Sequence, residues 1–138
     1  MTTGGCLCGV IRYEVNETRA GVALHCHCKD CQRVTGSGKA TVVMFSNEDI
    51  KIDGDVKLYT SRGTDGSHVN RGFCPNCGSQ LFSFVDEIPN QTFVKAGTLD
   101  DSDWVAISMT CWTDSASKWS RTELEIINFS GNPTLESE

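Results

Sequence analysis

The sequence predicts a mainly β protein built from short strands, with cysteine-bearing loops between them. Apolar residues come in short runs that alternate with polar residues, which is typical of strands of about four to eight residues. Turn-forming pairs such as Asp53-Gly54, Asp65-Gly66 and Pro89-Asn90 lie between these runs. The sequence has no internal repeat, low-complexity tract, linker or long amphipathic helix. Its 138 residues fit a single domain covering residues 1–138.

The expected strands and turns follow one another along most of the chain. The runs that predict strands are Val10–Val15, Gly21–Leu24, Ala40–Phe45, Val56–Tyr59, His68–Phe73, Gln80–Val85, Thr92–Ala96 and Val105–Thr110. Short helical turns are expected at Lys29–Thr35, Asn47–Ile50 and Ser115–Trp119. The tail, residues 128–138, contains a Gly-Asn-Pro turn and acidic residues, so we expect it to fray.

Charge and hydropathy exclude several classes of protein. The formal net charge is −6 and no Lys/Arg cluster occurs, which argues against a nucleic-acid partner. Met1 leads into Thr-Thr-Gly-Gly, which lacks the charged and apolar regions of a secretory signal. Apolar runs such as Val42–Phe45 are far too short to span a bilayer. We therefore expect a cytoplasmic protein with no membrane partner, and the sequence leaves its oligomeric state open.

The eight cysteines carry the clearest chemical signal in the chain. In a reducing compartment they are poor candidates for disulfides, and their close spacing indicates metal thiolates instead. Seven of them form three motifs, Cys6-x-Cys8, Cys26-x-Cys28-x2-Cys31 and Cys74-x2-Cys77. Zinc takes four protein ligands in structural sites, and three plus an open position in catalytic sites. Seven cysteines divide naturally into four and three.

The four-cysteine cluster pairs the first motif with the last, and its members are Cys6, Cys8, Cys74 and Cys77. Pro75 fixes φ after one ligand and Gly78 permits a tight turn after the next. Joining the two motifs closes a loop of roughly 70 residues, which stabilises the fold by about 4 kcal/mol in chain-entropy terms. We expect a structural zinc here; the alternative is a set of unpaired thiols.

The cysteine triad comprises Cys26, Cys28 and Cys31, three thiols that can all reach one ion. We interpret it as the ligand set of a catalytic zinc with one open position, and the triad as the catalytic residues. Two alternatives remain at this point: a second closed site with His25 or His27 as fourth ligand, or a redox-active thiol cluster. Lys29 and Arg33 flank the triad and could offset its charge, unless both are simply solvated.

Cys111 stands alone in an apolar stretch, so we expect it to be a small buried residue. His68 lies within a predicted strand, and a surface or turn position is expected for it rather than a ligand role.

Four segments carry a family resemblance: Gly4–Tyr13, His25–Arg33 with Gly36, Gly72–Leu81 and Ala96–Asp100. In this order and spacing the chain resembles the glutathione-dependent formaldehyde-activating enzyme family, which also includes centromere protein V. The resemblance covers about residues 4–120. It implies an Mss4-like fold of several small antiparallel sheets around zinc, with short helical turns.

The resemblance also implies sites and chemistry. It places Cys6, Cys8, Cys74 and Cys77 on a structural zinc, and Cys26, Cys28 and Cys31 on a catalytic zinc. We expect the catalytic site to be the one that can be only partly occupied by its ion. The family's named activity joins glutathione and formaldehyde into S-hydroxymethylglutathione, and its wider class is carbon–sulfur lyase. The implied partners are a small thiol such as glutathione and an aldehyde.

One position departs from the family's pattern. Many members carry a Pro-x-x-His-Ile motif before a final tryptophan, whereas this chain reads Ile107 to Trp112 with Thr110 in place of the histidine. If that histidine binds substrate or transfers protons in those members, this chain lacks its contribution. Two functions follow: a zinc-dependent carbon–sulfur lyase acting on a thiol–aldehyde adduct, or a non-catalytic zinc-binding module that contacts another protein.

Overall fold

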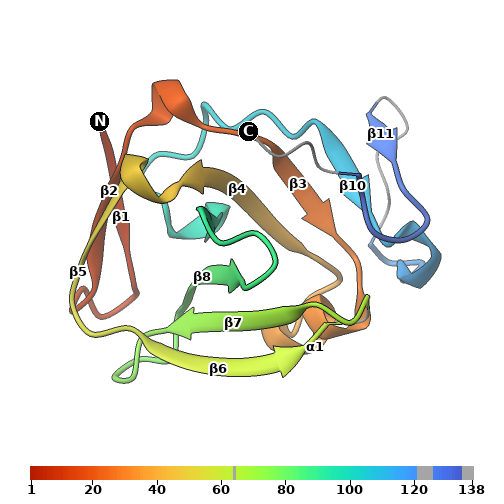
Figure 1. The fold of residues 1–138 in the computed structure, drawn as a ribbon, viewed down its shortest axis with the longest axis horizontal. Coiled ribbons are helices and arrows are strands. Elements are labelled where there is room, and N and C mark those ends of the chain that lie inside the picture. The colour runs from red at the N-terminus through yellow and green to blue at the C-terminus, as the bar shows by residue number, and fades with distance from the viewer. Residues whose placement is uncertain (64, 121–125, 135–138) are drawn as a thin grey trace.

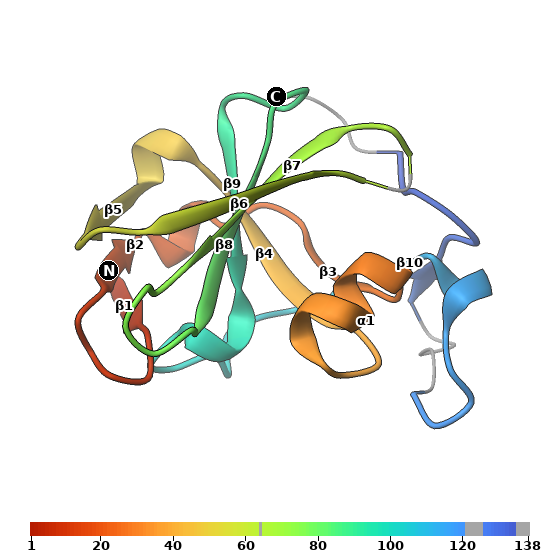
Figure 2. The same ribbon diagram turned by 90° about the horizontal axis from the view of Figure 1, so that it is seen from below.

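The computed structural model describes residues 1–63, 65–120 and 126–134. Within these residues the fold is mainly β, as the sequence predicts, with one helix and several 3-10 turns. The strands form a three-stranded sheet and an eight-stranded sheet. Two views of the ribbon place the small sheet and the β10–β11 edge of the large sheet at opposite ends of the molecule (Figures 1 and 2).

The strands have the following bounds: β1 Thr2–Gly5, β2 Arg12–Val15, β3 Ala23–Cys26, β4 Ala40–Ser46, β5 Ile50–Asp53, β6 Lys57–Arg62, β7 His68–Phe73, β8 Gln80–Val85, β9 Gln91–Lys95, β10 Met109–Cys111 and β11 Ile127–Asn128. The helical segments are η1 Glu17–Arg19, α1 Lys29–Thr35, η2 Asn47–Asp49, η3 Ala96–Thr98 and η4 Thr113–Ser115.

Most expected elements occur close to their predicted places, and the exceptions have physical reasons. The predicted turn Lys29–Thr35 is helix α1, whereas the turn expected at Ser115–Trp119 lies earlier, at η4. The expected strand Val105–Thr110 shortens to β10. Strand β1 was not expected, because its Thr-Thr-Gly-Gly sequence lacks apolar alternation and it depends on antiparallel pairing with β2.

The large sheet has the order β11-β10-β3-β4-β9-β8-β7-β6. Its pairs are antiparallel except at one edge, where β10 runs parallel to both β3 and β11. The small sheet, β1-β2-β5, is antiparallel throughout. One of the two sheets is thus small and antiparallel, as the sequence predicts, and the other is larger and has a parallel edge.

The two faces of the large sheet pack against different partners. One face contributes Val43, Phe82 and Val94 to a core shared with Ile11 and Tyr13 of the small-sheet region. The opposite face carries a second apolar cluster, whose buried members are Leu24, Val42, Met44, Phe93 and Cys111. Side chains alternate along each strand, so neighbouring residues such as Val42 and Val43 belong to different clusters. Strand β4 is apolar on both faces because both are covered.

The chain after β10 is held by backbone hydrogen bonds where the sequence predicts fraying from residue 128. Phe129 N donates to Thr110 O over 2.7 Å, and Trp112 N donates to Gly131 O over 2.9 Å. The Trp112 indole N–H reaches Asn132 Oδ1 over 2.8 Å. These bonds anchor residues 128–132 beside β10, while residues 135–138 lie outside the described part of the chain.

Candidate metal centres and substrate cavity

The described residues contain two groups of cysteines whose sulfur atoms converge. In each group the sulfur atoms all lie within 4.8 Å of one another. The first group is the four-cysteine cluster and the second is the cysteine triad. All eight cysteines are free thiols. Thiolates are soft donors that suit zinc, and four or three of them match its closed and open ligand sets.

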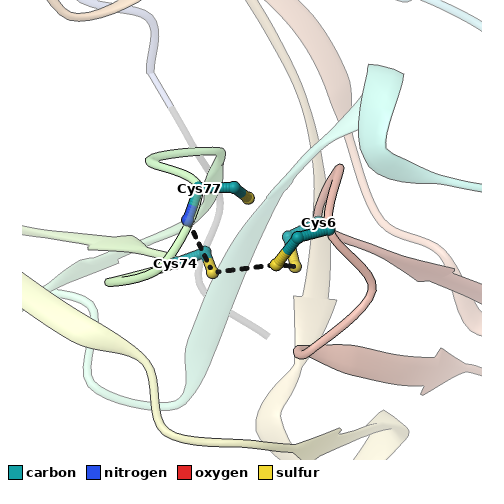
Figure 3. Close-up of side chains that lie close together, drawn as sticks. Cys6, Cys74 and Cys77 are labelled. Carbon is teal, nitrogen blue, oxygen red and sulfur yellow. Dashed lines mark hydrogen bonds between the residues drawn. The ribbon is translucent and has the colours of Figure 1, made fainter.

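The four-cysteine cluster is built by two tight loops that face each other. In Figure 3, Cys6 approaches from one loop, and Cys74 and Cys77 from the other. Cys6 Sγ lies 3.6 Å from Cys8 Sγ, and Cys8 Sγ lies 3.8 Å from Cys74 Sγ. Gly78, with φ of 77°, takes the left-handed conformation that glycine adopts without strain, as the sequence predicts.

Backbone N–H groups surround these sulfurs. Ile11 N donates to Cys6 Sγ over 3.3 Å, and Asn76 N and Cys77 N each donate to Cys74 Sγ over 3.4 Å. Ser79 links the loops, because its Oγ accepts from Leu7 N over 3.0 Å and lies 3.2 Å from Cys77 Sγ. Such donors offset the negative charge that four thiolates bring to one ion.

The same contacts shift the ionisation of the thiols. The Ser79 hydroxyl is the main cause that lowers the pKa of Cys77 to about 5. Burial opposes ionisation of Cys6, but hydrogen bonds from Ile11 N and the neighbouring thiols outweigh it and hold its pKa below the ordinary value. Burial raises the pKa of Cys74. In the four-cysteine cluster, Cys6 and Cys77 therefore ionise easily, whereas Cys74 needs a nearby cation to favour its thiolate.

The cysteine triad lies where β3 ends and α1 begins. Cys28 is the N-cap of α1, and its Sγ accepts a hydrogen bond from Cys31 N over 3.3 Å. The helix ends at Gly36, which has φ of 66° and donates its N–H to Gln32 O. One turn of helix therefore brings Cys31 back beside Cys28, and the sequence spacing alone was sufficient to predict this.

Gln32 fixes the triad to the rest of the molecule. Its buried Nε2 donates to His27 O over 2.8 Å and to Ser115 O over 2.9 Å. These bonds satisfy two carbonyl groups and tie α1 to both the triad loop and η4. Sequence reasoning missed this role, because a glutamine in a short helix gives no sign of its partners.

Neither neighbouring histidine joins the triad's group of candidate ligands within the described residues. His25 Nδ1 lies 2.8 Å from Thr41 Oγ1. His27 is fully buried, and neither of its ring nitrogens has a hydrogen-bond partner among the described residues. The geometry thus favours three protein ligands at this site over a closed site with a histidine.

The three triad thiols share protons unequally. Hydrogen bonds from Cys26 and Cys31 lower the pKa of Cys28 to about 3. The thiols of Cys111 and Cys28 raise the pKa of Cys26, and those of Cys26 and Cys28 raise the pKa of Cys31. Without a cation, Cys28 is the thiolate of the group; a divalent ion would favour ionisation of all three.

A cavity of about 250 Å³ opens beside the triad. Its wall is the second face of the large sheet, and its apolar part includes Leu24, Val42, Val69, Val85 and Phe93. All three triad residues line it, whereas no residue of the four-cysteine cluster does. Of the two cysteine groups, the triad is therefore the one that faces this cavity among the described residues.

Two cations also line this cavity, Arg71 on β7 and Lys95 on β9. Burial lowers the pKa of Lys95, an effect opposed by the charge of Cys31 and reinforced by that of Arg71. The cations suggested by the sequence, Lys29 and Arg33, are instead exposed and do not line the cavity. Sequence reasoning missed Arg71 and Lys95 because only strand pairing brings them to the triad.

Cys111 is buried, as expected, and it also lines the cavity. It pairs with Cys26 across the parallel β10–β3 ladder. Thr110, the position where many relatives have histidine, pairs instead with His25 and is fully buried. Because side chains alternate along a strand, Thr110 lies on the opposite face from Cys111 and the cavity.

The sequence matches the family described as glutathione-dependent formaldehyde-activating enzyme over residues 1–115. The chain belongs to this family. A solved structure of a Rhodobacter sphaeroides protein is similar in fold, with a TM-score of 0.55 and 24% sequence identity, over 71% of this chain and 87% of that chain. No curated protein gives a significant match.

Membership in the formaldehyde-activating enzyme family agrees with the structure in two respects. The fold is mainly β, and two cysteine groups are arranged so that each could hold a zinc ion. Among the described residues, no helix is both long enough and apolar enough to cross a membrane.

Proposed function

We propose that the protein is a zinc-dependent enzyme of carbon–sulfur chemistry, which forms and cleaves the adduct of a small thiol and an aldehyde. The observation that carries this proposal is the contrast in access between the two cysteine groups. The triad supplies three ligands and faces a cavity, whereas the four-cysteine cluster is complete and lies away from it. Three protein ligands with an open position is the arrangement of catalytic zinc sites.

The residue roles in this proposal follow the two groups. Cys6, Cys8, Cys74 and Cys77 hold a structural zinc, and Cys26, Cys28 and Cys31 hold the catalytic one. Zinc held by the triad would keep a coordination position for the substrate thiol and lower that thiol's pKa. The family description names glutathione and formaldehyde, which makes glutathione our first candidate thiol.

The reaction needs no redox partner. The thiolate sulfur adds to the aldehyde carbon, a C–S bond forms, and the carbonyl π electrons move to oxygen, which takes up a proton. Cleavage is the reverse, and this direction corresponds to the carbon–sulfur lyase class. The cavity wall excludes bulk water from part of the substrate and orients it toward the triad.

Paired serine variants test the division of roles. Cys28→Ser keeps an oxygen that can cap α1 but removes a thiolate, so we expect a folded protein that no longer accelerates adduct exchange. Cys77→Ser should unfold the domain, because the four-cysteine cluster joins distant segments. Exchange is measured by ¹³C NMR on labelled formaldehyde with glutathione, and folding by circular dichroism. Equal unfolding of both variants would contradict the assignment.

Zinc-edge absorption spectroscopy separates this proposal from a non-catalytic binding module. If the triad is open, the average number of sulfur neighbours per zinc should rise toward four when glutathione is added. If both sites are already four-coordinate and no small thiol changes the spectrum, the non-catalytic binding module would be favoured instead.

We further propose that residues 1–138 form one domain and that the protein works in the cytoplasm. Two hydrophobic clusters share the same large sheet, which supports a single folding unit. A reducing compartment supports eight cysteines in the thiol state.

A further inference from the structure

Two cationic side chains lie on the face of the large sheet that lines the cavity. Arg71 pairs with Ser83, and Ser83 pairs with Phe93, so all three side chains share that face. Lys95 lies two residues beyond Phe93 on β9 and therefore points to the same side. Neither cation is near the other in sequence, so the sheet itself brings them together.

Neither cation has a carboxylate partner. In residues 1–63, 65–120 and 126–134, no Asp or Glu oxygen lies within the 4.0 Å of an ion pair from Arg71 or Lys95. Arg71 is 9% exposed and donates to Ser61 Oγ over 2.5 Å. Arg71 is buried and Lys95 is half-buried, so the lack of a carboxylate partner is costly for both. An anion that enters the cavity would remove part of that cost.

The two cations outweigh the net charge that a zinc-loaded triad would carry. A zinc ion with three thiolates has a net charge of −1, and Arg71 with Lys95 contributes +2, which leaves +1. Three acidic residues also line the cavity, Asp30, Asp65 and Glu87. Asp65 and Glu87 are exposed and already engaged, because Asp65 accepts from Ser67 and Asn132, and Glu87 accepts from His68 N. Their charges disfavour a multiply charged ligand.

The volume of the cavity also favours a small ligand. Its volume of about 250 Å³ is below the range of about 300–1,000 Å³ that pockets for drug-sized ligands occupy. Val42, Val69 and Phe93 give it apolar walls beside the cations. The space therefore suits a short carbon chain with one charged end.

We propose that Arg71 and Lys95 bind a carboxylate of the substrate, and that the triad acts on a small thiol–aldehyde adduct bearing this carboxylate close to its reacting carbon. This inference rests on the proposed function and narrows its substrate class, because a short adduct with one carboxylate takes the place of glutathione as the first candidate. The carboxylate stays intact in the reaction: only the C–S bond forms or breaks, with the proton carried by the adduct oxygen.

Binding of matched thiols to the zinc-loaded protein tests the carboxylate site without relying on turnover. We expect 3-mercaptopropionate to bind at least about tenfold more tightly than 3-mercapto-1-propanol, since a hydrogen-bonded charge pair commonly contributes that much. Isothermal titration calorimetry measures both affinities. Propionate should compete with 3-mercaptopropionate, and this needs no variant. Equal affinity for the two thiols would overturn the proposal.

Variants of Arg71 and Lys95 test whether these residues cause the preference for the carboxylate-bearing thiol. Lys95→Met should reduce the affinity ratio of 3-mercaptopropionate to 3-mercapto-1-propanol to within about twofold, with both zinc ions retained. Lys29→Met, at an exposed position, should leave this ratio unchanged. Arg71→Lys keeps the charge but loses the guanidinium fork, so a partial loss is expected. If Lys95→Met releases the triad zinc but keeps the preference, the cations merely offset thiolate charge and the proposal fails.

Matched aldehydes show which reactant carries the carboxylate. Glyoxylate with 3-mercapto-1-propanol places the charge on the aldehyde, and glycolaldehyde with 3-mercaptopropionate places it on the thiol. The uncharged control pair is glycolaldehyde with 3-mercapto-1-propanol. Faster adduct exchange with either charged pair than with this control supports the proposal and shows which reactant carries the carboxylate. Accelerated exchange without any carboxylate preference overturns this inference and leaves the proposed function standing. Carboxylate binding without accelerated exchange would overturn the proposed function, and with it the adduct as substrate, and would leave only the carboxylate site standing.

Discussion

The two cysteine groups use the same ligand chemistry in opposite structural settings. The four-cysteine cluster joins loops 66 residues apart and lies within a shell of backbone N–H donors. The triad draws its thiols from six consecutive residues and faces a cavity. A metal whose ligands lie far apart in the sequence stabilises the fold as a crosslink. A metal with an open coordination position can bind substrate. Under the proposed function, one chain therefore assigns stability and reactivity to two separate metal sites.

Metal removal should separate the two groups most clearly. As a chelator is titrated, we expect a first zinc to leave with little change in circular dichroism, and the second to leave together with loss of the folded state. The cause is that the triad closes only a short loop, whereas the four-cysteine cluster contributes about 4 kcal/mol by loop closure alone. Zinc release is followed with a colorimetric indicator. Simultaneous release and unfolding in one step would remove the distinction.

Gln32→Leu should weaken the triad without touching the four-cysteine cluster. The change leaves the carbonyls of His27 and Ser115 without their buried donor, at a cost of about 1–3 kcal/mol. Urea denaturation gives the free energy of unfolding, and metal analysis gives the zinc content. The control is Arg33→Leu at the next, exposed position, where a change within about 0.5 kcal/mol is expected. Equal losses in both variants would show that Gln32 has no special role.

Ser79→Ala should make the four-cysteine cluster more sensitive to acid. The Ser79 hydroxyl holds the pKa of Cys77 at about 5, so its loss raises that pKa and lets protons displace zinc at a higher pH. The lost hydrogen bonds should also cost about 0.5–1.5 kcal/mol. Zinc release is measured as pH falls. Ser37→Ala, at an exposed position after α1, is the control and should release zinc at the pH of the unmodified protein.

Asp100→Asn should give the smallest effect, confined to the acid side of the stability profile. Asp100 pairs with Arg12 on β2, next to the loop that carries Cys6 and Cys8, and Arg12 lowers the pKa of the carboxyl. A lowered carboxyl pKa contributes stability above its unfolded value of about 3.9, which is lost as pH falls through the folded pKa. Thermal denaturation below pH 5 should show a flatter dependence in the variant. An unchanged slope would mean that the exposed pair contributes nothing.

Local patterns in the sequence were sufficient to predict the two cysteine groups and most of the strands and helical segments. Cys28 and Cys31 are brought together by a single helical turn, and alternating residues identified strands such as β7 and β8. The family resemblance supplied the fold type, and the match over residues 1–115 confirms it.

Features that depend on strand pairing could not be predicted in the same way. Arg71 and Lys95 meet at the cavity only because β7, β8 and β9 pair in a particular register. Thr110 shows the same limit, since its departure from the family's pattern suggested a lost group at the reaction site. The register of β10 on β3 places that side chain on the face away from the cavity.

The 66-residue separation between Cys8 and Cys74 also sets an order of events during synthesis. At about 5–20 residues per second, a ribosome needs roughly 3–13 s to deliver the second half of the four-cysteine cluster after the first. At the same rate, the ribosome adds Cys31 about 1 s or less after Cys26, which completes the triad. A nascent chain can therefore complete its triad before its four-cysteine cluster, and during that interval Cys6 and Cys8 leave the ribosome as an open pair of thiols.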